Sequence, residues 1–489
     1  MKKRSLRFNY IINLILTLST FLFPLITFPY VSRVLLPEGM GKVRFASSLI
    51  SYFTMLAQLG IPTYGIRACA AVRDDRRELT RTVHELLLIQ LIMSAVSYLG
   101  LTLSLLFVPR LQAERLLFIV MSVSILLSSV GMEWLYSALE QYTYITARSL
   151  FFRTLAVAAT FLLIREQSDY VFYGGVSILA ASFSNLLNLL NAHKYIDFKR
   201  PGRYDLRRHL KSVAIFFALA CATTVYTNLD SLMLGFMTTD TEVGYYDAAV
   251  RVKLILSGVV ASLGTVLLPR LSYYVERGEL EEFRRVTGKA LRFVFLSALP
   301  LTLYFLLFAA PSIYLLSGPA YAPAILPMRL IMPTVFLIGL TNLLGLQIMV
   351  PMGREKTVLY SVVLGAVVDL LLNALLIPRM GSSGAAVGTL AAEAAVLVFQ
   401  LAALRGMLRE AFRRLAYGKL ALALALGTLS SLWLLRMGLG HFMTLLVSAL
   451  LFFGVYGLSL LLTGEELTRE LCTQAVHTLR AMREKLGQR

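Results

Sequence analysis

Charged residues are scarce in this sequence. Asp, Glu, Lys and Arg make up 15% of its 489 residues, while hydrophobic residues make up 57%. Soluble globular chains carry about 25% charged residues, and a soluble chain of this length divides into about three domains joined by polar linkers. The composition therefore disfavours cytosolic enzymes, disordered chains and secreted scaffolds. It indicates a polytopic membrane protein with short loops.

Cysteine and recognisable catalytic motifs are also scarce. The three cysteines, Cys69, Cys221 and Cys472, lie far apart without a CxxC pair, which argues against a disulfide framework or a zinc knuckle. The five histidines show no HExxH or other metal-ligand spacing, and the sequence has no Walker A motif. We therefore predict a protein that is not an enzyme, with no catalytic residues, no metal and no cofactor. Coupling to H⁺ or Na⁺ stays open.

Long apolar runs dominate the chain, whose mean hydropathy is +0.71. A spanning helix needs about 20 apolar residues, and a window of about 19 residues finds about 14 such segments. The first run is too long for a signal peptide, so we expect it to be a retained span. The predicted spans are 9–35, 43–64, 84–108, 115–137, 148–164, 170–192, 212–237, 244–269, 290–317, 324–351, 356–377, 383–404, 416–436 and 440–462.

The predicted fold class is therefore all-α integral membrane, with about 14 transmembrane helices. Segments 41–46 and 244–249 are similar and follow the first and seventh predicted spans, as expected for two parallel six-helix repeats. This pattern predicts two six-helix lobes followed by two further helices. The expected domains are an N-terminal lobe at 1–200, a C-terminal lobe at 201–410, two additional transmembrane helices at 411–463 and a cytoplasmic amphipathic tail at 464–489.

Positive charges predict the orientation of the chain in the membrane. The formal net charge is +19, which in a soluble protein would suggest nucleic-acid binding. Here most Lys and Arg lie at the N-terminus, in alternate loops and in the C-terminal tail, and loops rich in these residues stay cytoplasmic. We therefore expect both termini in the cytoplasm and no nucleic-acid partner. The most basic loop, 193–211, is the expected linker between the lobes.

Three charged residues fall inside predicted spans near the expected outer side, namely Arg33, Asp230 and Arg251. Charges in hydrocarbon are costly and are functional candidates by default. One interpretation is a hydrated cavity in which guanidinium groups meet a phosphate-bearing substrate, with Asp230 tuning their affinity or exchanging an ion. The other is structural, because Arg33 can snorkel to headgroups and Asp230 can pair with Arg251.

Further charges lie in or beside other predicted spans. Glu133, Asp369 and Glu393 are isolated acids within spans, and the first two are candidates for ion coupling or charge balance. Arg67, Arg148 and Arg153 lie closer to the expected cytoplasmic side. These arginines fit either substrate phosphates in an inward-open state or lipid headgroups, and the sequence does not separate the two.

Several segments carry a resemblance to a known family. The segment Arg33–Gly41, RVLLPEGMG, and the segment Leu59–Arg67, LGIPTYGIR, resemble the opening signature of polysaccharide repeat-unit flippases of O-antigen type. These flippases belong to the multidrug/oligosaccharidyl-lipid/polysaccharide exporter superfamily. The similar segments continue in the same order to about residue 405, and they include 133–135, 228–230, 243–246, 318–324, 345–348 and 373–386.

The resemblance implies a V-shaped bundle in the bacterial cytoplasmic membrane that moves an undecaprenyl-diphosphate-linked oligosaccharide to the outer leaflet by alternating access. The cavity cations of the family correspond to Arg33 and Arg251, and its acid in the seventh span corresponds to Asp230. Arg67 and Asn373 are further substrate-binding candidates. Leu36 departs from the pattern, because the family usually has glycine there.

Membrane lipids, a polysaccharide polymerase and glycosyltransferases are the expected partners besides the lipid-linked glycan. Two alternative functions remain open, a flippase for a lipid-linked peptidoglycan precursor and a cation-coupled multidrug antiporter. The first span lacks the acidic ion site usual in drug exporters, which disfavours the antiporter. A membrane glycan enzyme is disfavoured because the predicted extracytoplasmic loops are short.

Overall fold

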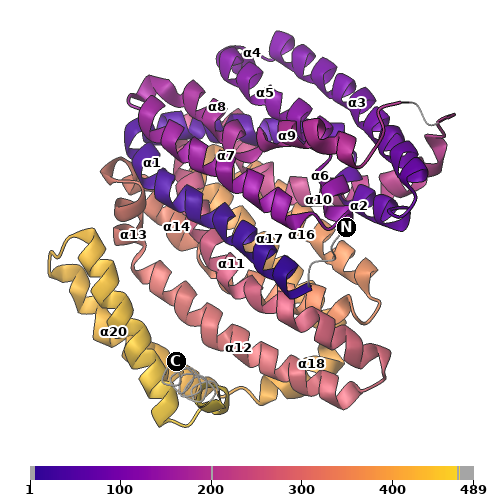
Figure 1. Ribbon diagram of the computed structural model, residues 1–489. Coiled ribbons are helices and arrows are strands. Elements are labelled where there is room, and N and C mark those ends of the chain that lie inside the picture. The colour runs from indigo at the N-terminus through magenta and orange to yellow at the C-terminus, as the bar shows by residue number, and fades with distance from the viewer. Residues whose placement is uncertain (1–5, 200–201, 471–472, 474–489) are drawn as a thin grey trace, which may run out of the picture. The chain divides into compact units, whose positions relative to one another are not determined.

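The computed structural model describes residues 6–199, 202–470 and 473, and these residues form helices without any strand (Figure 1). The predicted all-α membrane class is confirmed. Eleven of the described helical segments are long and apolar enough to cross a membrane, and the bent pair Pro319–Ile331 and Pro333–Met349 makes a twelfth. The predicted total of about 14 agrees with these helices, because α1 is long enough for two crossings and α11 is a further long apolar helix.

The chain divides into two compact units, Met1–Asp247 with Ile377–Ser382, and Ala248–Leu376 with Ser383–Arg489. The predicted domain boundaries stay predictions, and the tail expected at 464–489 lies mostly outside the described residues. The elements up to the second unit are α1 (Leu6–Gln58), α2 (Ile61–Ala71), α3 (Arg76–Phe107), α4 (Pro109–Gln112), α5 (Arg115–Val130), α6 (Glu133–Ala138), α7 (Tyr142–Leu163), η1 (Gln167–Asp169), α8 (Tyr170–Ala181), α9 (Ser184–Asn191), η2 (Ala192–Lys194) and α10 (Arg207–Met237).

Helix α11 begins in the first unit and continues into the second. The elements from there on are α11 (Asp240–Glu276), α12 (Leu280–Leu307), α13 (Ala309–Leu316), η3 (Pro319–Ala324), α14 (Ile325–Ile331), α15 (Pro333–Asn342), the π-helix η4 (Leu343–Met349), α16 (Glu355–Met380), α17 (Ser382–Ala403), α18 (Arg405–Arg413), α19 (Tyr417–Leu432), η5 (Trp433–Arg436) and α20 (His441–Leu462).

Several predicted spans are broken rather than continuous. The fourth, 115–137, consists of α5 and α6 and breaks at Met132, whose φ is +43°. The sixth, 170–192, consists of α8 and α9 and breaks at 182–183, while the ninth consists of α12 and α13. The tenth bends by 40° at Met332, directly before Pro333. Hydropathy cannot detect these breaks, because the residues on both sides are equally apolar.

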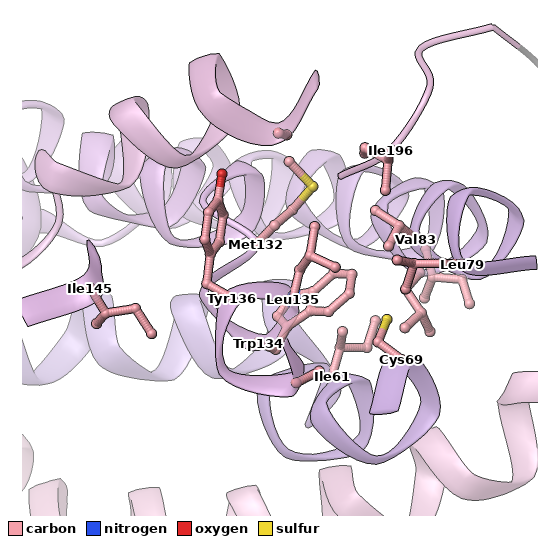
Figure 2. Packing of buried hydrophobic residues seen from close by; sticks show 14 of the residues in the cluster. Ile61, Cys69, Leu79, Val83, Met132, Trp134, Leu135, Tyr136, Ile145 and Ile196 are labelled. Carbon is pink, nitrogen blue, oxygen red and sulfur yellow. The ribbon is translucent and has the colours of Figure 1, made fainter. Parts of the chain in front are cut away.

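A buried apolar cluster holds the ends of several helices of the first unit together. Figure 2 shows Ile61 and Cys69 from α2 beside Trp134 and Leu135 from α6, with Leu79 and Val83 from α3 nearby. A Cβ at Gly65 would lie 2.8 Å from the indole of Trp134, so a glycine is required for α2 and α6 to approach this closely. Helix α6 has only six residues, and its packing in this cluster holds it in place.

Helix α1 is interrupted at Leu36, the position where the family usually has glycine. The backbone angles there are φ +58° and ψ +176°, a conformation that is essentially confined to glycine and costs a residue with a side chain about 1–3 kcal/mol. The side chain of Leu36 is exposed. Leucine therefore occupies a strained turn between the two parts of α1.

Replacing Leu36 with glycine should stabilise the folded protein by about 1 kcal/mol, because the relief of strain exceeds the entropy that glycine loses on folding. Thermal unfolding of the purified protein in detergent would measure this gain. The neighbouring Leu35 is helical and fully buried, so Leu35→Gly is the matched control and should destabilise the protein. An unfolding temperature of Leu36→Gly at or below that of the wild type would contradict the strain at this residue.

Candidate functional site

A network of charged and polar side chains connects α1, α10 and the first turns of α11 within the first unit. The guanidinium Nε of Arg44 lies 3.4 Å from Oδ1 of Asp247 and donates a hydrogen bond of 3.1 Å to the hydroxyl of Ser231. Asp247 is buried, with 4% of its side chain exposed, and Arg44 is half-buried. Three helices are therefore joined by one ion pair and one hydrogen bond.

Asp230 has a hydrogen-bond partner within this unit, and its pairing with Arg251 stays one of the two open interpretations. The hydroxyl of Tyr246 on α11 donates a short hydrogen bond to Oδ2 of Asp230, and both side chains are buried. Tyr246 is a residue that the charge-based search missed. A phenol beside a buried carboxylate stabilises its negative charge without introducing a positive one.

The turn between α10 and α11 is held by a second ion pair. Arg110 of α4 lies beside the carboxylate of Asp240, and its Nε also donates to the carbonyl of Gly235 at 3.0 Å. The close packing of α1 on this turn requires glycine, because a Cβ at Gly41 would overlap the carbonyl of Asp240, and one at Gly244 would overlap that of Pro37. Small residues at such contacts let helix backbones approach in membranes.

The predicted substrate-binding arginines are accessible side chains. Arg33 is exposed, and its Nη1 donates to the carbonyl of Pro29 one turn earlier. Arg67 is exposed on α2, and Arg251 is half-buried in the part of α11 that belongs to the second unit. The expected meeting of Arg33, Asp230 and Arg251 in one cavity stays a prediction.

Glu133 is not the isolated acid that its surroundings in the sequence suggested. Its Oε2 lies 2.9 Å from Nη2 of Arg148, whose side chain is only 2% exposed. Arg148 also donates to the hydroxyl of Ser184 and, at 3.3 Å, to Oδ1 of Asn185. The buried guanidinium is thus held by α6 and α9, which makes a role in helix packing the simplest reading of this arginine.

In the second unit, the remaining candidates lie side by side on α16. Asp369 and Asn373 are one helical turn apart, and both are buried. A Cβ at Gly388 of α17 would lie 3.3 Å from Oδ1 of Asp369 and would overlap Oδ1 of Asn373. Thr389, next to Gly388, is also buried, and its hydroxyl donates to the carbonyl of Ala385. Two side-chain oxygens of α16 therefore lie beside Gly388 of α17, where the missing side chain gives them room.

The search for charges within predicted spans overlooked the central ion pair. Arg44 and Asp247 lie near the beginnings of the predicted spans 43–64 and 244–269, and the prediction used them only as members of the similar segments 41–46 and 244–249. No group of three or more His, Cys, Asp and Glu side chains that could hold a metal occurs among the described residues. The described part of the first unit offers buried ion pairs and exposed arginines.

Removing one member of the Arg44–Asp247 pair should destabilise the protein by about 3 kcal/mol, because the other charge would remain buried without its counter-charge. The double replacement Arg44→Ala with Asp247→Ala should recover a large part of this loss. Thermal unfolding of the single and double variants forms a double-mutant cycle. The control is Arg414→Ala. Arg414 and its partner Glu410 are each about two-thirds exposed, so the expected loss is under about 1 kcal/mol. Additive losses at Arg44 and Asp247 would show that the pair carries no coupling energy.

The comparisons with known proteins agree with this architecture. The family described as "Polysaccharide biosynthesis protein" matches residues 6–275. The chain is 25% identical over 406 residues to the "Putative O-antigen transporter" of Escherichia coli (strain K12), covering 82% of this chain and 96% of that protein.

Two solved structures share the fold at low sequence identity. The lipid II flippase MurJ in an inward closed conformation has a TM-score of 0.72 at 14% identity. The alignment covers 94% of this chain and 99% of the MurJ chain. An inward-facing multidrug resistance MATE transporter of the MOP superfamily has a TM-score of 0.62 at 14% identity, covering 81% and 96%. The structures support the fold alone, whereas the family match extends over more than half of the sequence. The chain is therefore a multi-pass membrane protein that belongs to the polysaccharide biosynthesis protein family.

Proposed function

We propose that this protein is a flippase that moves an undecaprenyl-diphosphate-linked oligosaccharide from the cytoplasmic to the outer leaflet of a bacterial cytoplasmic membrane by alternating access. The observation that carries the proposal is the family match together with accessible arginines in otherwise apolar helices. Arg33 is exposed, and Arg251 is half-buried. Accessible guanidinium groups suit the paired oxygens of a diphosphate.

Each part of such a substrate makes a different physical demand. The diphosphate needs positive charge and hydrogen-bond donors, and Arg33, Arg251 and Arg67 supply both. The lipid tail stays in the bilayer, since moving it through a polar path would cost about 0.8 kcal/mol for each CH₂ group taken out of hydrocarbon. We place both termini in the cytoplasm. The glycosyltransferases would build the glycan before this protein moves it, and the polymerase would act on it afterwards.

Arg33→Ala and Arg251→Ala should each lower glycan export about tenfold or more, because one charge-assisted hydrogen bond to a phosphate contributes about 1.5–3 kcal/mol. Lysine at either position should restore part of the export, since it keeps the charge but loses the planar fork. Export is measured as surface glycan in a flippase-deficient host at equal protein level. Arg405→Ala, at an exposed arginine of α18, is the control. Normal export by both alanine variants would remove these arginines from substrate binding.

Coupling to an ion is proposed for the acids of the two units, Asp230 and Asp369, with Asn373 beside the second. A carboxylate that takes up H⁺ or Na⁺ changes the charge of its surroundings, so its occupancy can bias one state of an alternating-access cycle over the other. The oxygens of Asp369 and Asn373 face Gly388 across α16 and α17, which permits a compact oxygen site in the second unit. Asp230 has the phenol of Tyr246 as a hydrogen-bond donor.

Asp369→Asn and Gly388→Ala should both abolish the response of transport to an imposed H⁺ or Na⁺ gradient. The first removes the charge, and the second keeps it but adds a methyl group that overlaps Oδ1 of Asn373. Uptake of a fluorescent lipid-linked glycan into proteoliposomes, with each gradient applied in turn, measures the response. Gly454→Ala is the matched control, because a Cβ there meets no neighbouring atom. Full gradient dependence in Asp369→Asn would exclude that acid from coupling, and Asp230→Asn tests the other acid in the same assay.

The same assay separates this function from its alternatives. Lipid II in place of the lipid-linked glycan tests the peptidoglycan-precursor flippase. Drug susceptibility of a deletion strain tests the multidrug antiporter. Transport of intact lipid-linked glycan by the purified protein would argue against a glycan-modifying enzyme, because the substrate would be recovered unchanged.

A further inference from the structure

The first unit contains a cavity of about 490 Å³ that none of the charged residues discussed above lines. It lies among α1, the start of α2, α5, α8 and α10, all of which belong to this unit. More than half of its described lining residues carry a hydroxyl or an amide, and none of them is charged. Ligand sites in proteins commonly measure about 300–1,000 Å³. The cavity is therefore large enough for a small organic ligand, and its lining is unusual for membrane helices.

The polar lining comes from a regular pattern in the sequence. Ser47, Ser51, Thr54 and Gln58 follow one another at intervals of four, three and four residues, which places them on one face of α1. Ser124 on α5 adds a hydroxyl from another helix. Such a face has no packing advantage in hydrocarbon, since apolar residues would fill it equally well. Its position along a cavity indicates contact with something that forms hydrogen bonds.

Several of these hydroxyls direct lone pairs toward the cavity. Ser51 donates to the carbonyl of Ser47 at 2.8 Å, Thr54 to that of Ile50 at 2.8 Å, and Ser124 to that of Met121 at 2.7 Å. The hydrogen of each hydroxyl is thus used within its own helix, which is the common arrangement for these residues in spans. The oxygen remains able to accept a hydrogen bond from a ligand.

Other hydroxyls of the lining remain able to donate. Those of Ser128, Ser182 and Thr224 line the cavity, and no hydrogen bond joins them to another group in the described part of the chain. Ser182 is only 7% exposed as a residue, and its hydroxyl is open to the space of the cavity. A buried polar group without a hydrogen bond costs about 1–3 kcal/mol, so water or a ligand must satisfy it. The cavity therefore presents both acceptors and donors.

The lining excludes most parts of the proposed substrate and several other ligands. A diphosphate needs cations, which the described lining lacks, and a lipid tail or an apolar drug would leave the hydroxyls unsatisfied. A single metal ion or proton would not need a volume of about 490 Å³. An uncharged group that carries many hydroxyls fits both the size and the balance of donors and acceptors.

We infer that this cavity binds an uncharged sugar residue of the transported glycan, apart from the arginines that bind the diphosphate. The inference rests on the proposed flippase function and assigns one part of its substrate to one set of residues. No aromatic side chain is among the described lining residues, so sugar rings are held by hydrogen bonds without stacking. Binding is therefore weak, as translocation requires, since a tightly held substrate would not be released.

Protection of an introduced thiol tests binding directly. In a protein with Cys69, Cys221 and Cys472 replaced by alanine, Ser128→Cys should react with a water-soluble thiol reagent. The probe ligand is the oligosaccharide released by mild acid from the lipid-linked glycan of the source bacterium. At saturation it should slow the reaction at least fivefold. The control is Ser297→Cys, which should show no protection. Ser297 is half-buried on α12 in the second unit, and its hydroxyl donates to a carbonyl of its own helix. A reactive but unprotected thiol at residue 128 would mean a cavity that holds water only, and it would overturn the inference.

Filling the cavity gives a second, independent test in proteoliposomes. Ser51→Leu should lower transport of the lipid-linked glycan at least fivefold while leaving transport of sugar-free undecaprenyl diphosphate unchanged, because only the glycan loses its site. Ser297→Leu is the matched control and should affect neither substrate. Equal loss for both substrates, or no loss for either, would overturn the sugar site. A wild-type protein that moves no lipid-linked glycan would instead overturn the proposed function, so the two failures are distinguishable.

Discussion

The first unit depends on the rule that a charge buried within membrane helices must find its counter-charge inside the protein. Arg44 meets Asp247 across α1 and α11, and Arg148 meets Glu133 across α7 and α6. The first pair joins helices that are far apart in the sequence, and the second joins two consecutive helices. Hydrophobic attraction between helices is absent in hydrocarbon, so such polar contacts and close packing determine which helices associate.

The ion pairs in turn depend on glycine. Gly41 and Gly244 let α1 approach the turn between α10 and α11 so closely that any Cβ would overlap a carbonyl group. Gly235 plays the same role against the ring of Phe45. Without this approach, the side chain of Arg44 could not reach both Ser231 and Asp247. The glycines and the ion pair of this region therefore depend on one another.

The sequence predicted the helices well, because twenty apolar residues in a row leave the backbone few alternatives in a membrane. It did not predict where they break. The turns at Leu36 and Met132 have positive φ in residues that have no local preference for it, so tertiary packing imposes them. The substrate-binding residues stay predictions. Charge alone identified Glu133 and Arg148 but not their pairing, and it did not identify Arg44, because pairing depends on which helices become neighbours.

The hydroxyl-lined cavity shows what a search for charges overlooks. Serine and threonine are nearly neutral on hydropathy scales, so four polar residues on one face of α1 do not interrupt its apolar run. Their spacing is nevertheless a stronger signal than their number, since random placement would scatter them around the helix. For a substrate that carries a charged anchor and an uncharged glycan, the two kinds of site differ in what they must do. Guanidinium groups hold the anchor firmly, whereas weakly binding hydroxyls let glycans pass without trapping them. When different residues bind the anchor and the glycan, the strongest interaction is made with the diphosphate, which every substrate molecule carries.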